Sequence, residues 1–240
     1  MSRQARRAKQ RRRGALSRKT QQRKTILFWV TLGILVVAAG IAIVATKHQT
    51  PEAIKNSTDS AKKVLAGPAG PEAIPLEIGE PLAPLATTAG APVDSIQCQP
   101  NEQVVYHIHA HLTMFVNGAL RALPPGIGIV QPQPDTSSSL PFYNATSCYY
   151  WMHVHAQDGV IHVESPTQST YTLGQFFDLW NQPLSKTRLA TAKGKLTVYV
   201  NGKRYNGDPR SIALKSREDI QIDVGKVVPP EKVDWAPSHL

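Results

Sequence analysis

The sequence predicts an α+β protein in which one transmembrane helix and a spacer precede a compact, mostly antiparallel β domain. Three observations support this prediction: an uncharged apolar stretch near the N-terminus, a Pro/Ala-rich segment after it, and alternating apolar and polar residues from about residue 96 onwards. One or two short helices are expected within the domain. A β-grasp-like arrangement is one form that such strand pairs with a single intervening helix can take.

The basic charge of the chain is concentrated at its N-terminus. The chain carries 27 Lys and Arg against 17 Asp and Glu, and residues 1–24 hold 11 of the basic residues and no acid. Removing those 11 leaves 16 basic against 17 acidic side chains, so the rest of the chain is close to neutral. We interpret residues 1–24 as a cytoplasmic tail that contacts anionic lipid headgroups, and we expect no nucleic-acid partner.

Residues 25–46, TILFWVTLGILVVAAGIAIVAT, form a stretch of 22 residues without a charge. A helix of that length spans a hydrocarbon core of about 30 Å, and Trp29 lies near one end, where interfacial aromatic residues are common. A cleaved signal peptide has a shorter apolar region, and Val44-Ala45-Thr46 matches a cleavage site only loosely. We therefore expect a single-pass anchor in the cell membrane, with a cytoplasmic N-terminus and an extracytoplasmic chain after Lys47.

Three further segments follow the predicted membrane helix. Residues 47–95 are rich in Pro and Ala and predict an extracytoplasmic linker. Residues 96–225 contain the strand patterns and the histidines, and they predict the folded domain. Residues 226–240, with Pro229-Pro230, predict a C-terminal tail.

The two cysteines, Cys98 and Cys148, both follow the membrane helix, where disulfides persist. Each precedes a histidine-rich strand, so a disulfide between them would join the starts of two strands. The alternative is a thiolate ligand for copper. That alternative is weaker because Cys148 lies outside the strand that carries the histidines.

Within the domain, residues 104–116 alternate apolar and polar side chains and predict a strand that ends at an Asn117-Gly118 hairpin turn. Residues 124–148 are rich in Pro, Gly and Ser and predict a loop. Residues 172–180 predict a short amphipathic helix capped by Thr172. Residues 219–225, DIQIDVG, predict a closing strand.

Six of the eight histidines fall into two clusters on predicted strands. The clusters are His107, His109 and His111, and then His153, His155 and His162. In each cluster the alternation places the histidines on one face of the strand and apolar residues on the other. If the disulfide aligns the strands, both clusters line one shared surface.

A two-residue turn at Asp158-Gly159 predicts the register of the second cluster. In that register His155 faces His162 and His153 faces Glu164, and all four side chains project from one face. Neighbouring imidazoles at these separations can converge on one ion, with Glu164 as a fourth ligand, a partner that orients His153, or a general base.

An imidazole-rich site without thiolate suits Zn²⁺ or Cu²⁺, so we expect a copper or zinc ion as the cofactor. The candidate ligands are His107, His109, His111, His153, His155, His162 and Glu164. The alternative for the same residues is a polar face whose histidines form hydrogen bonds or respond to pH.

The His153-x-His155 strand with His162 on the neighbouring strand resembles the zinc-binding triplet of the α-carbonic anhydrases. This resemblance covers the triplet spacing alone, because the flanking motifs of that family are absent. Cupins also combine His-x-His with Glu, but their glycine framing is absent here.

Three functions remain open from the sequence. The first is metal binding or delivery at the membrane surface, because six histidines exceed the ligands that one ion needs. The second is a metalloenzyme with three histidine ligands, an open water position and Glu164 as the base. The third is a non-metal extracytoplasmic interaction module.

Overall fold

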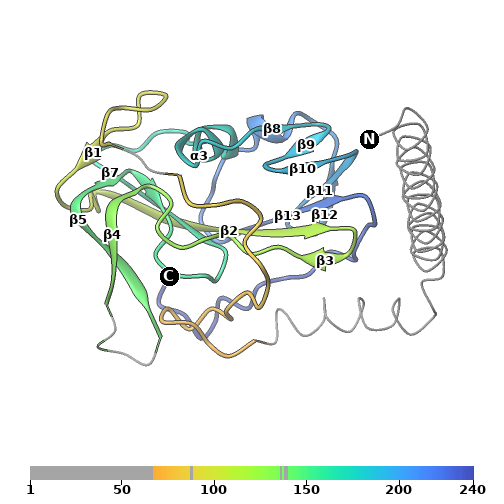
Figure 1. The fold of residues 1–240 in the computed structure, drawn as a ribbon, viewed down its shortest axis with the longest axis horizontal. Helices are drawn as coiled ribbons and strands as arrows, with labels where there is room; N and C mark the ends of the chain where they lie inside the picture. The colour runs from red at the N-terminus through yellow and green to blue at the C-terminus, as the bar shows by residue number, and fades with distance from the viewer. Residues whose placement is uncertain (1–66, 87–88, 136, 138–139) are drawn as a thin grey trace, which may run out of the picture. The chain divides into compact units, whose positions relative to one another are not determined.

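A seven-stranded mixed sheet forms the centre of the part of the chain that the computed structural model describes, which is residues 67–86, 89–135, 137 and 140–240 (Figure 1). Its path runs through β12 (Lys203–Tyr205), β11 (Leu196–Val200), β13 (Glu218–Val224), β2 (Tyr106–Val116), β7 (Val160–Ser165) and β6 (Met152–His153), and β3 (Ala119–Leu120) pairs with β2. Neighbouring strands of this sheet are antiparallel except β13 and β2, which are parallel.

The strand predicted at residues 104–116 is confirmed as β2. Its apolar residues Ala110, Leu112 and Met114 are fully buried on one face of the sheet. Asn117 and Gly118 then adopt φ values of 54° and 84°, the positive pair that a type I′ hairpin turn requires. The closing strand predicted at residues 219–225 is likewise confirmed as β13, Glu218–Val224.

One α-helix, α3 (Leu173–Leu179), covers the apolar face of the sheet. Thr172 caps it, and a reciprocal hydrogen bond with Gln175 completes a capping box, which satisfies two backbone N–H groups that a helix leaves unpaired. Phe176 and Phe177 are fully buried in the same core as the sheet residues. The predicted helix over residues 172–180 is therefore confirmed.

A second, three-stranded sheet contains β1 (Cys98–Gln99), β5 (Phe142–Tyr150) and β4 (Ile129–Asp135). The loop predicted at residues 124–148 was wrong, since β4 and most of β5 lie within it. Pro132 and Pro134 are compatible with β4 because it is an edge strand, where a missing backbone N–H costs little. A bulge between Val130 and Pro132 interrupts the pairing.

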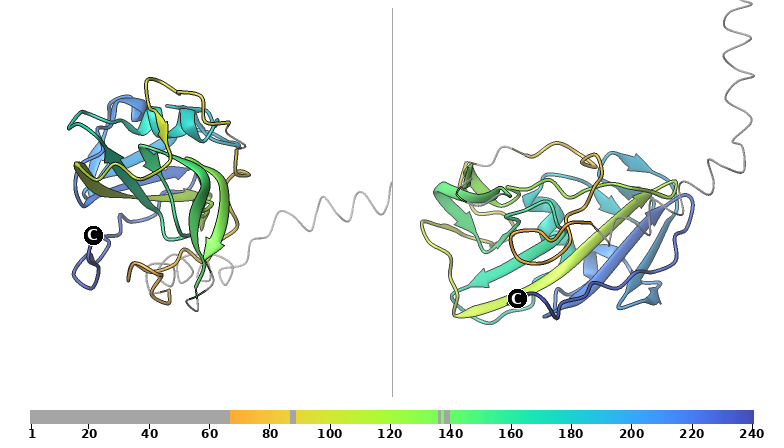
Figure 2. Two further views of the ribbon diagram at one scale, coloured as in Figure 1. Left: turned by 90° about the vertical axis from the view of Figure 1, so that its left-hand side faces the viewer. Right: turned by 90° about the horizontal axis from the view of Figure 1, so that it is seen from below.

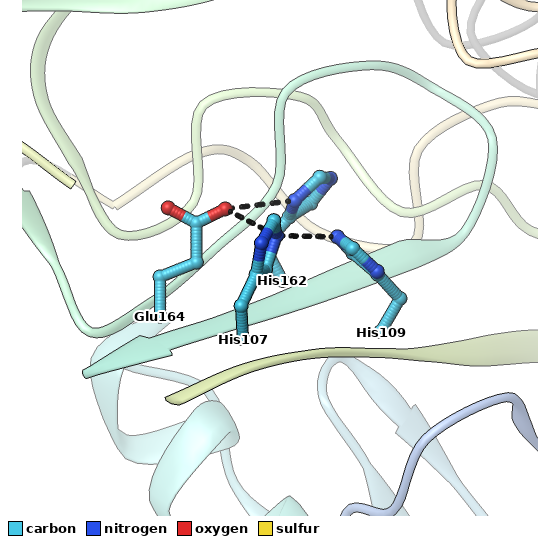
Figure 3. Close-up of side chains that lie close together, drawn as sticks. All are labelled: His107, His109, His162 and Glu164. Atoms are coloured by element: carbon cyan, nitrogen blue, oxygen red, sulfur yellow. Dashed lines mark hydrogen bonds and ion pairs between the residues drawn. The ribbon is translucent and has the colours of Figure 1, made fainter. Parts of the chain in front are cut away.

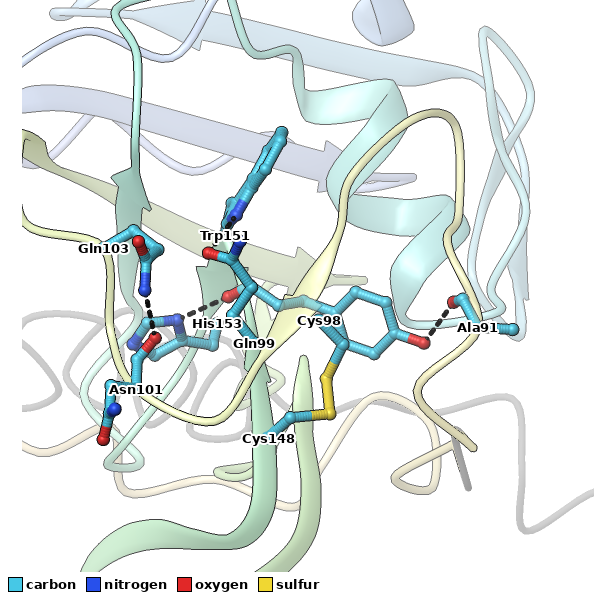
Figure 4. The surroundings of a disulfide bond; sticks show 9 residues. Ala91, Cys98, Gln99, Asn101, Gln103, Cys148, Trp151 and His153 are labelled. Atoms are coloured by element: carbon cyan, nitrogen blue, oxygen red, sulfur yellow. Dashed lines mark hydrogen bonds between the residues drawn. A yellow bond between two sulfur atoms is a disulfide. The ribbon is translucent and has the colours of Figure 1, made fainter.

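Figure 4 shows the disulfide between Cys98 and Cys148, which confirms the predicted cysteine pair. The two residues lie on paired strands, because Cys98 is opposite Tyr150. The bridge therefore joins β1 to the end of β5, rather than the starts of the two histidine-rich strands.

The remaining short elements come between α3 and β13 in the chain. They are β8 (Leu184–Ser185), β9 (Arg188–Leu189) and β10 (Ala192–Lys193), which form a small sheet of their own, and the 3₁₀ helix η1 (Pro209–Ser211).

Segments before residue 96 and after residue 225 also pack on the sheet. Ile74 is fully buried against Val160 and Trp235, which joins the start of the described chain to β7 and to the C-terminal tail. Leu82 belongs to the main core, and Val228 packs with Phe115. Figures 1 and 2 show the C-terminal segment on the side of the sheet away from α3. Both faces of the sheet are therefore partly covered by these flanking segments.

The predicted basic tail, residues 1–24, and transmembrane helix, residues 25–46, lie outside the described residues. Across the ranges that are described, no helix is long and apolar enough to cross a membrane.

These observations confirm an α+β unit that is mostly β, with one α-helix among the described residues.

The packing of α3 predicts the effect of truncating its central aromatic residue. We expect Phe177→Ala to lower the free energy of unfolding by about 3–5 kcal/mol, because it removes a fully buried ring and leaves a cavity. The same truncation at Val105, which is 81% exposed, should change it by less than about 0.5 kcal/mol. Urea denaturation with an unchanged m-value is the measurement, and equal midpoints for the two variants would contradict this account of the core.

Candidate metal centre

The candidate site forms where β7 lies between β2 and β6. On one side His109 is opposite His162 and His107 is opposite Glu164. On the other side His153 is opposite His162. Side chains at paired positions project from the same face of a sheet, so β7 brings the two histidine clusters together on the face away from α3.

The predicted register of the second cluster was wrong by two residues. We predicted that His155 faces His162 and that His153 faces Glu164, whereas His153 faces His162 and Met152 faces Val163. A shift of two residues preserves the face on which each side chain lies. His155 therefore still points into the cluster, with its ring centroid 4.7 Å from that of His162.

The register differs because residues 154–159 form an anchored loop instead of a two-residue turn. Asp158 is fully buried, and its Oδ1 accepts a hydrogen bond from the Val160 amide at 3.1 Å. Gln157 donates to the Glu77 carbonyl at 2.8 Å, and the Gly159 carbonyl accepts from the Leu112 amide at 2.9 Å. The last two contacts tie the loop to Glu77 and to β2, which are distant in sequence, and the Asp158-Gly159 pair alone does not indicate them.

Two histidines of β2 and a glutamate of β7 form what we term the β2 set: His107, His109 and Glu164. The Nε2 atoms of His107 and His109 lie 2.9 Å apart, and His107 Nε2 lies 3.0 Å from Glu164 Oε1. Figure 3 shows these side chains converging, with His162 beside them. His162 Nδ1 lies 3.4 Å from the same Glu164 oxygen.

Two histidines at β6 and just after it form the β6 set together with a loop glutamate: His153, His155 and Glu102. The Nε2 atoms of His153 and His155 lie 2.9 Å apart, and His155 Nε2 lies 3.3 Å from Glu102 Oε1. Phe142 stacks on the His155 ring with a centroid distance of 4.1 Å and an interplanar angle of 9°. The stacked ring of Phe142 restricts the orientation of the His155 imidazole.

Backbone carbonyls fix the tautomer of the β6 set. His153 Nδ1 lies 2.9 Å from the Tyr150 carbonyl oxygen, and His155 Nδ1 lies 2.7 Å from the Tyr143 carbonyl oxygen. Because a carbonyl only accepts hydrogen bonds, each Nδ1 carries the proton and donates it. In the neutral rings both Nε2 atoms therefore present a lone pair, and these lone pairs face each other.

Two facing lone pairs repel unless a cation or a proton lies between them. Burial holds the pKa of His153 well below its usual value, since neighbouring His155 and His162 add to the cost of a positive charge there. Two nitrogens bound to one ion at 2.0–2.1 Å lie about 2.9–3.4 Å apart for angles between square and tetrahedral. The observed separation of 2.9 Å falls in that range.

His162 lies between the two sets, and its pKa is raised, whereas the pKa values of His153 and His109 are lowered. Burial works against its charged form, but the Glu164 and Glu72 carboxylates hydrogen-bonded to it raise the pKa of His162 to about 10. By contrast, burial and the neighbouring His162 lower the pKa of His109 to about 2. His109 is therefore available as a neutral ligand at neutral pH, whereas His162 must lose a proton to bind a metal.

Two acidic residues of the site were missed from the sequence. Glu72 Oε2 lies 3.1 Å from His162 Nε2, and Glu72 belongs to the segment that the sequence assigned to the linker. Glu102 lies in the turn region between β1 and β2. Neither glutamate lies in an alternating sequence pattern that would mark it as a candidate ligand. Only the contacts of Glu72 with His162 and of Glu102 with His155 reveal them.

His111 is set apart from the other five histidines. Its Nδ1 lies 3.2 Å from Thr113 Oγ1, its ring approaches Trp235, and it is opposite Val160 rather than a ligand-bearing residue of β7. Burial lowers its pKa to about 4. The structure thus gives His111 a neutral, buried position next to Gly159, and we leave it out of the site.

The remaining candidate ligands fall into three overlapping groups whose donor atoms lie within 4.8 Å of one another. The groups are His107, His109, His162 and Glu164; His153, His155 and His162; and Glu102, His153 and Glu164. Most of these side chains are buried, while those of His107 and Glu102 are 40% and 34% exposed. The arrangement offers a buried nitrogen-rich donor set that an ion can reach past these two residues.

Comparison with known proteins provides no family for the chain. No family model matches it, and neither a curated protein nor a solved structure matches it.

A buried carboxyl positions the segment that carries Glu72. Glu77 Oε2 accepts a hydrogen bond from the Leu123 amide at 3.1 Å, and the Glu77 amide donates to the Gln157 carbonyl at 2.8 Å. Its other oxygen, Oε1, has no hydrogen-bond partner. Burial, opposed by the hydrogen bond from Leu123, raises the pKa of Glu77 to about 8.

The raised pKa of Glu77 predicts that stability falls with increasing pH. Between about 4.5 and 8 the folded state keeps a proton on Glu77 that the unfolded state has lost, so the free energy of unfolding falls by up to about 1.4 kcal/mol per pH unit. Glu77→Gln mimics the protonated carboxyl and keeps an acceptor for Leu123. We expect the variant to match the metal-free wild type near pH 4.5 and to exceed it in stability at pH 8, as measured by urea denaturation.

Parallel stability curves for wild type and Glu77→Gln across this pH range would contradict the buried, protonated state of Glu77.

Proposed function

We propose that this protein is a single-pass membrane protein whose extracytoplasmic domain binds a copper or zinc ion, for metal binding or delivery at the membrane surface. The observation that carries the proposal is the pair of Nε2 atoms of His153 and His155, which lie 2.9 Å apart with both Nδ1 atoms at backbone carbonyls. Metal-binding histidines commonly donate their second ring nitrogen in this way, which fixes the free nitrogen towards the ion.

The donor types favour zinc or copper over the hard cations. Imidazole nitrogen dominates the site, and both cysteines are held in the disulfide. Nitrogen-rich sites suit Zn²⁺ and Cu²⁺, whereas Ca²⁺ and Mg²⁺ prefer oxygen ligands. Glu164 and Glu102 supply negative charge that offsets part of the charge of a bound divalent ion.

The proposed location rests on the sequence and on the disulfide. Residues 25–46 are long and apolar enough to cross a bilayer, and the basic residues 1–24 favour a cytoplasmic N-terminus beside anionic lipids. A disulfide between Cys98 and Cys148 is expected to persist outside the cytosol. On this proposal the histidine cluster lies where it can meet metal ions outside the cell.

A metalloenzyme is the second candidate, and one observation favours it. Glu164 Oε2 is buried and has no hydrogen-bond partner, so it is positioned to accept a proton from a metal-bound water. Against this candidate, none of the histidines lines the two hollows of about 430 and 380 Å³ on the described surface. A non-metal interaction module is the third candidate. In it a proton between the facing Nε2 atoms, supported by Glu102 at 3.3 Å from His155 Nε2, takes the place of the ion.

We also propose a β-grasp-like arrangement for the fold. In its support, β7, β2, β13, β11 and β12 lie side by side in that order around a parallel central pair. The chain passes through α3 between β7 and β11, and that helix packs on the apolar face of the sheet.

The metal-binding proposal predicts stoichiometric metal retention. We expect the full chain, purified in detergent without a histidine tag and dialysed after exposure to Zn²⁺ or Cu²⁺, to retain at least one equivalent of metal by elemental analysis. The His153→Ala/His155→Ala variant should retain about one equivalent less, because it loses both free Nε2 atoms of the β6 set.

The matched control is His239→Ala, which removes an exposed histidine outside the cluster and should leave the metal content unchanged. Wild-type protein with far less than one equivalent of both metals would reject the metal-binding proposal and the metalloenzyme alternative together.

A further inference from the structure

The histidine cluster contains more donors than one ion uses. A zinc ion binds four ligands in most protein sites. Five imidazoles and three carboxylates converge here, namely His107, His109, His153, His155, His162, Glu72, Glu102 and Glu164. One ion would leave about half of these buried polar groups without a metal partner.

The donors divide between strands that do not touch each other. Both histidines of the β2 set lie on β2. In the β6 set, His153 lies on β6 and His155 lies in the loop two residues after it. In the sheet, β7 lies between β2 and β6. Strands that are next-but-one in a sheet lie about 10 Å apart, so each close pair of Nε2 atoms forms a separate chelating edge.

Glu164 on β7 reaches both edges with different oxygens. Its Oε1 lies 3.0 Å from His107 Nε2 of the β2 set. Its Oε2 lies 3.9 Å from His153 Nε2 of the β6 set and forms no hydrogen bond, although the side chain is only 4% exposed. A buried carboxylate oxygen without a partner is costly, and a cation next to it would remove that cost.

We propose that the site holds two divalent ions of the zinc and copper class, bridged by the carboxylate of Glu164. This inference rests on the proposed metal-binding function. His107, His109 and Glu164 Oε1 bind the first ion, and His153, His155, Glu102 and Glu164 Oε2 bind the second. His162 belongs to donor groups on both sides and completes either shell.

Charge supports two ions rather than one. Three carboxylates gather around the imidazoles, and once His162 has lost its proton they offset three of the four positive charges that two divalent ions introduce. Ions held by a shared carboxylate in two-metal sites lie about 3.5–4 Å apart. The two oxygens of one carboxylate, here those of Glu164, can contact two ions at that separation.

Solvent access also differs between the two sets. The β2 set opens through His107, whose side chain is 40% exposed, and the β6 set opens through Glu102, whose side chain is 34% exposed. Each ion therefore has its own route to solvent, which suits a protein that takes up or releases ions one at a time.

The test counts ions per chain in the full-length protein in detergent, with Zn²⁺ as the probe. We expect two zinc ions per wild-type chain by elemental analysis after dialysis. His107→Ala/His109→Ala and His153→Ala/His155→Ala should each retain one, because each double substitution removes one chelating edge. His239→Ala should retain two.

Two outcomes of this zinc count distinguish a failure of the two-ion inference from a failure of the proposed metal binding. One zinc ion per wild-type chain, with none in either double variant, would overturn the two-ion inference and leave metal binding intact. No zinc or copper in the wild type would overturn both.

A spectroscopic measurement keeps the inference falsifiable if a double variant fails to fold. Two Cu²⁺ ions bridged by one carboxylate couple their unpaired spins, so we expect the wild type with two Cu²⁺ per chain to show an EPR intensity well below its copper content. Glu164→Gln retains the size of the side chain but removes the bridging charge, and its EPR intensity should equal its copper content. Full, uncoupled intensity in the wild type would overturn the bridge.

Discussion

The hydrogen bonds from His153 Nδ1 to the Tyr150 carbonyl and from His155 Nδ1 to the Tyr143 carbonyl determine where the free nitrogens of the site point. A carbonyl cannot donate, so each bond assigns the ring proton to Nδ1 and leaves Nε2 as an acceptor. Both acceptors then face each other in a buried position. The proposed affinity for a metal ion follows from this arrangement. A cation between the two nitrogens attracts both lone pairs and so offsets the repulsion between them.

The rest of the structure supports these two bonds. Tyr143 and Tyr150 lie at either end of β5, and the Cys98–Cys148 disulfide ties that strand to β1, which leads into the loop with Glu102. On the other side of the cluster, Glu77 anchors the segment that brings Glu72 to His162. The apolar face of the sheet packs on α3, so its opposite face can hold a polar cluster without disturbing the main core.

The sequence predicted the parts of the fold that depend on local patterns. Alternation identified β2 and β13, Asn117-Gly118 identified a hairpin turn, and the capped helix after Tyr171 was placed correctly because Thr172 and the apolar spacing are local signals. The sequence also grouped His107, His109, His153, His155, His162 and Glu164 on strand faces that the sheet brings together.

The parts that failed depend on distant contacts. The Asp158-Gly159 pair suggested a tight turn, but Asp158 is fully buried and the neighbouring Gln157 side chain donates to the distant Glu77 carbonyl, so residues 154–159 form a longer loop. Glu72 and Glu102 were missed because only the folded chain brings them to the histidines. His111 shares the alternation of His107 and His109, yet its partner in the sheet is Val160, which no local pattern indicates.

Nitrogen-15 NMR of the histidine rings in the metal-free protein tests the central claim most directly. The account predicts that His153 and His155 carry their proton on Nδ1, with the Nε2 signal of His153 typical of an unprotonated nitrogen at neutral pH, and that both Nε2 signals shift when Zn²⁺ is added. Rings protonated at Nε2, with Nδ1 bare and unchanged by Zn²⁺, would contradict it.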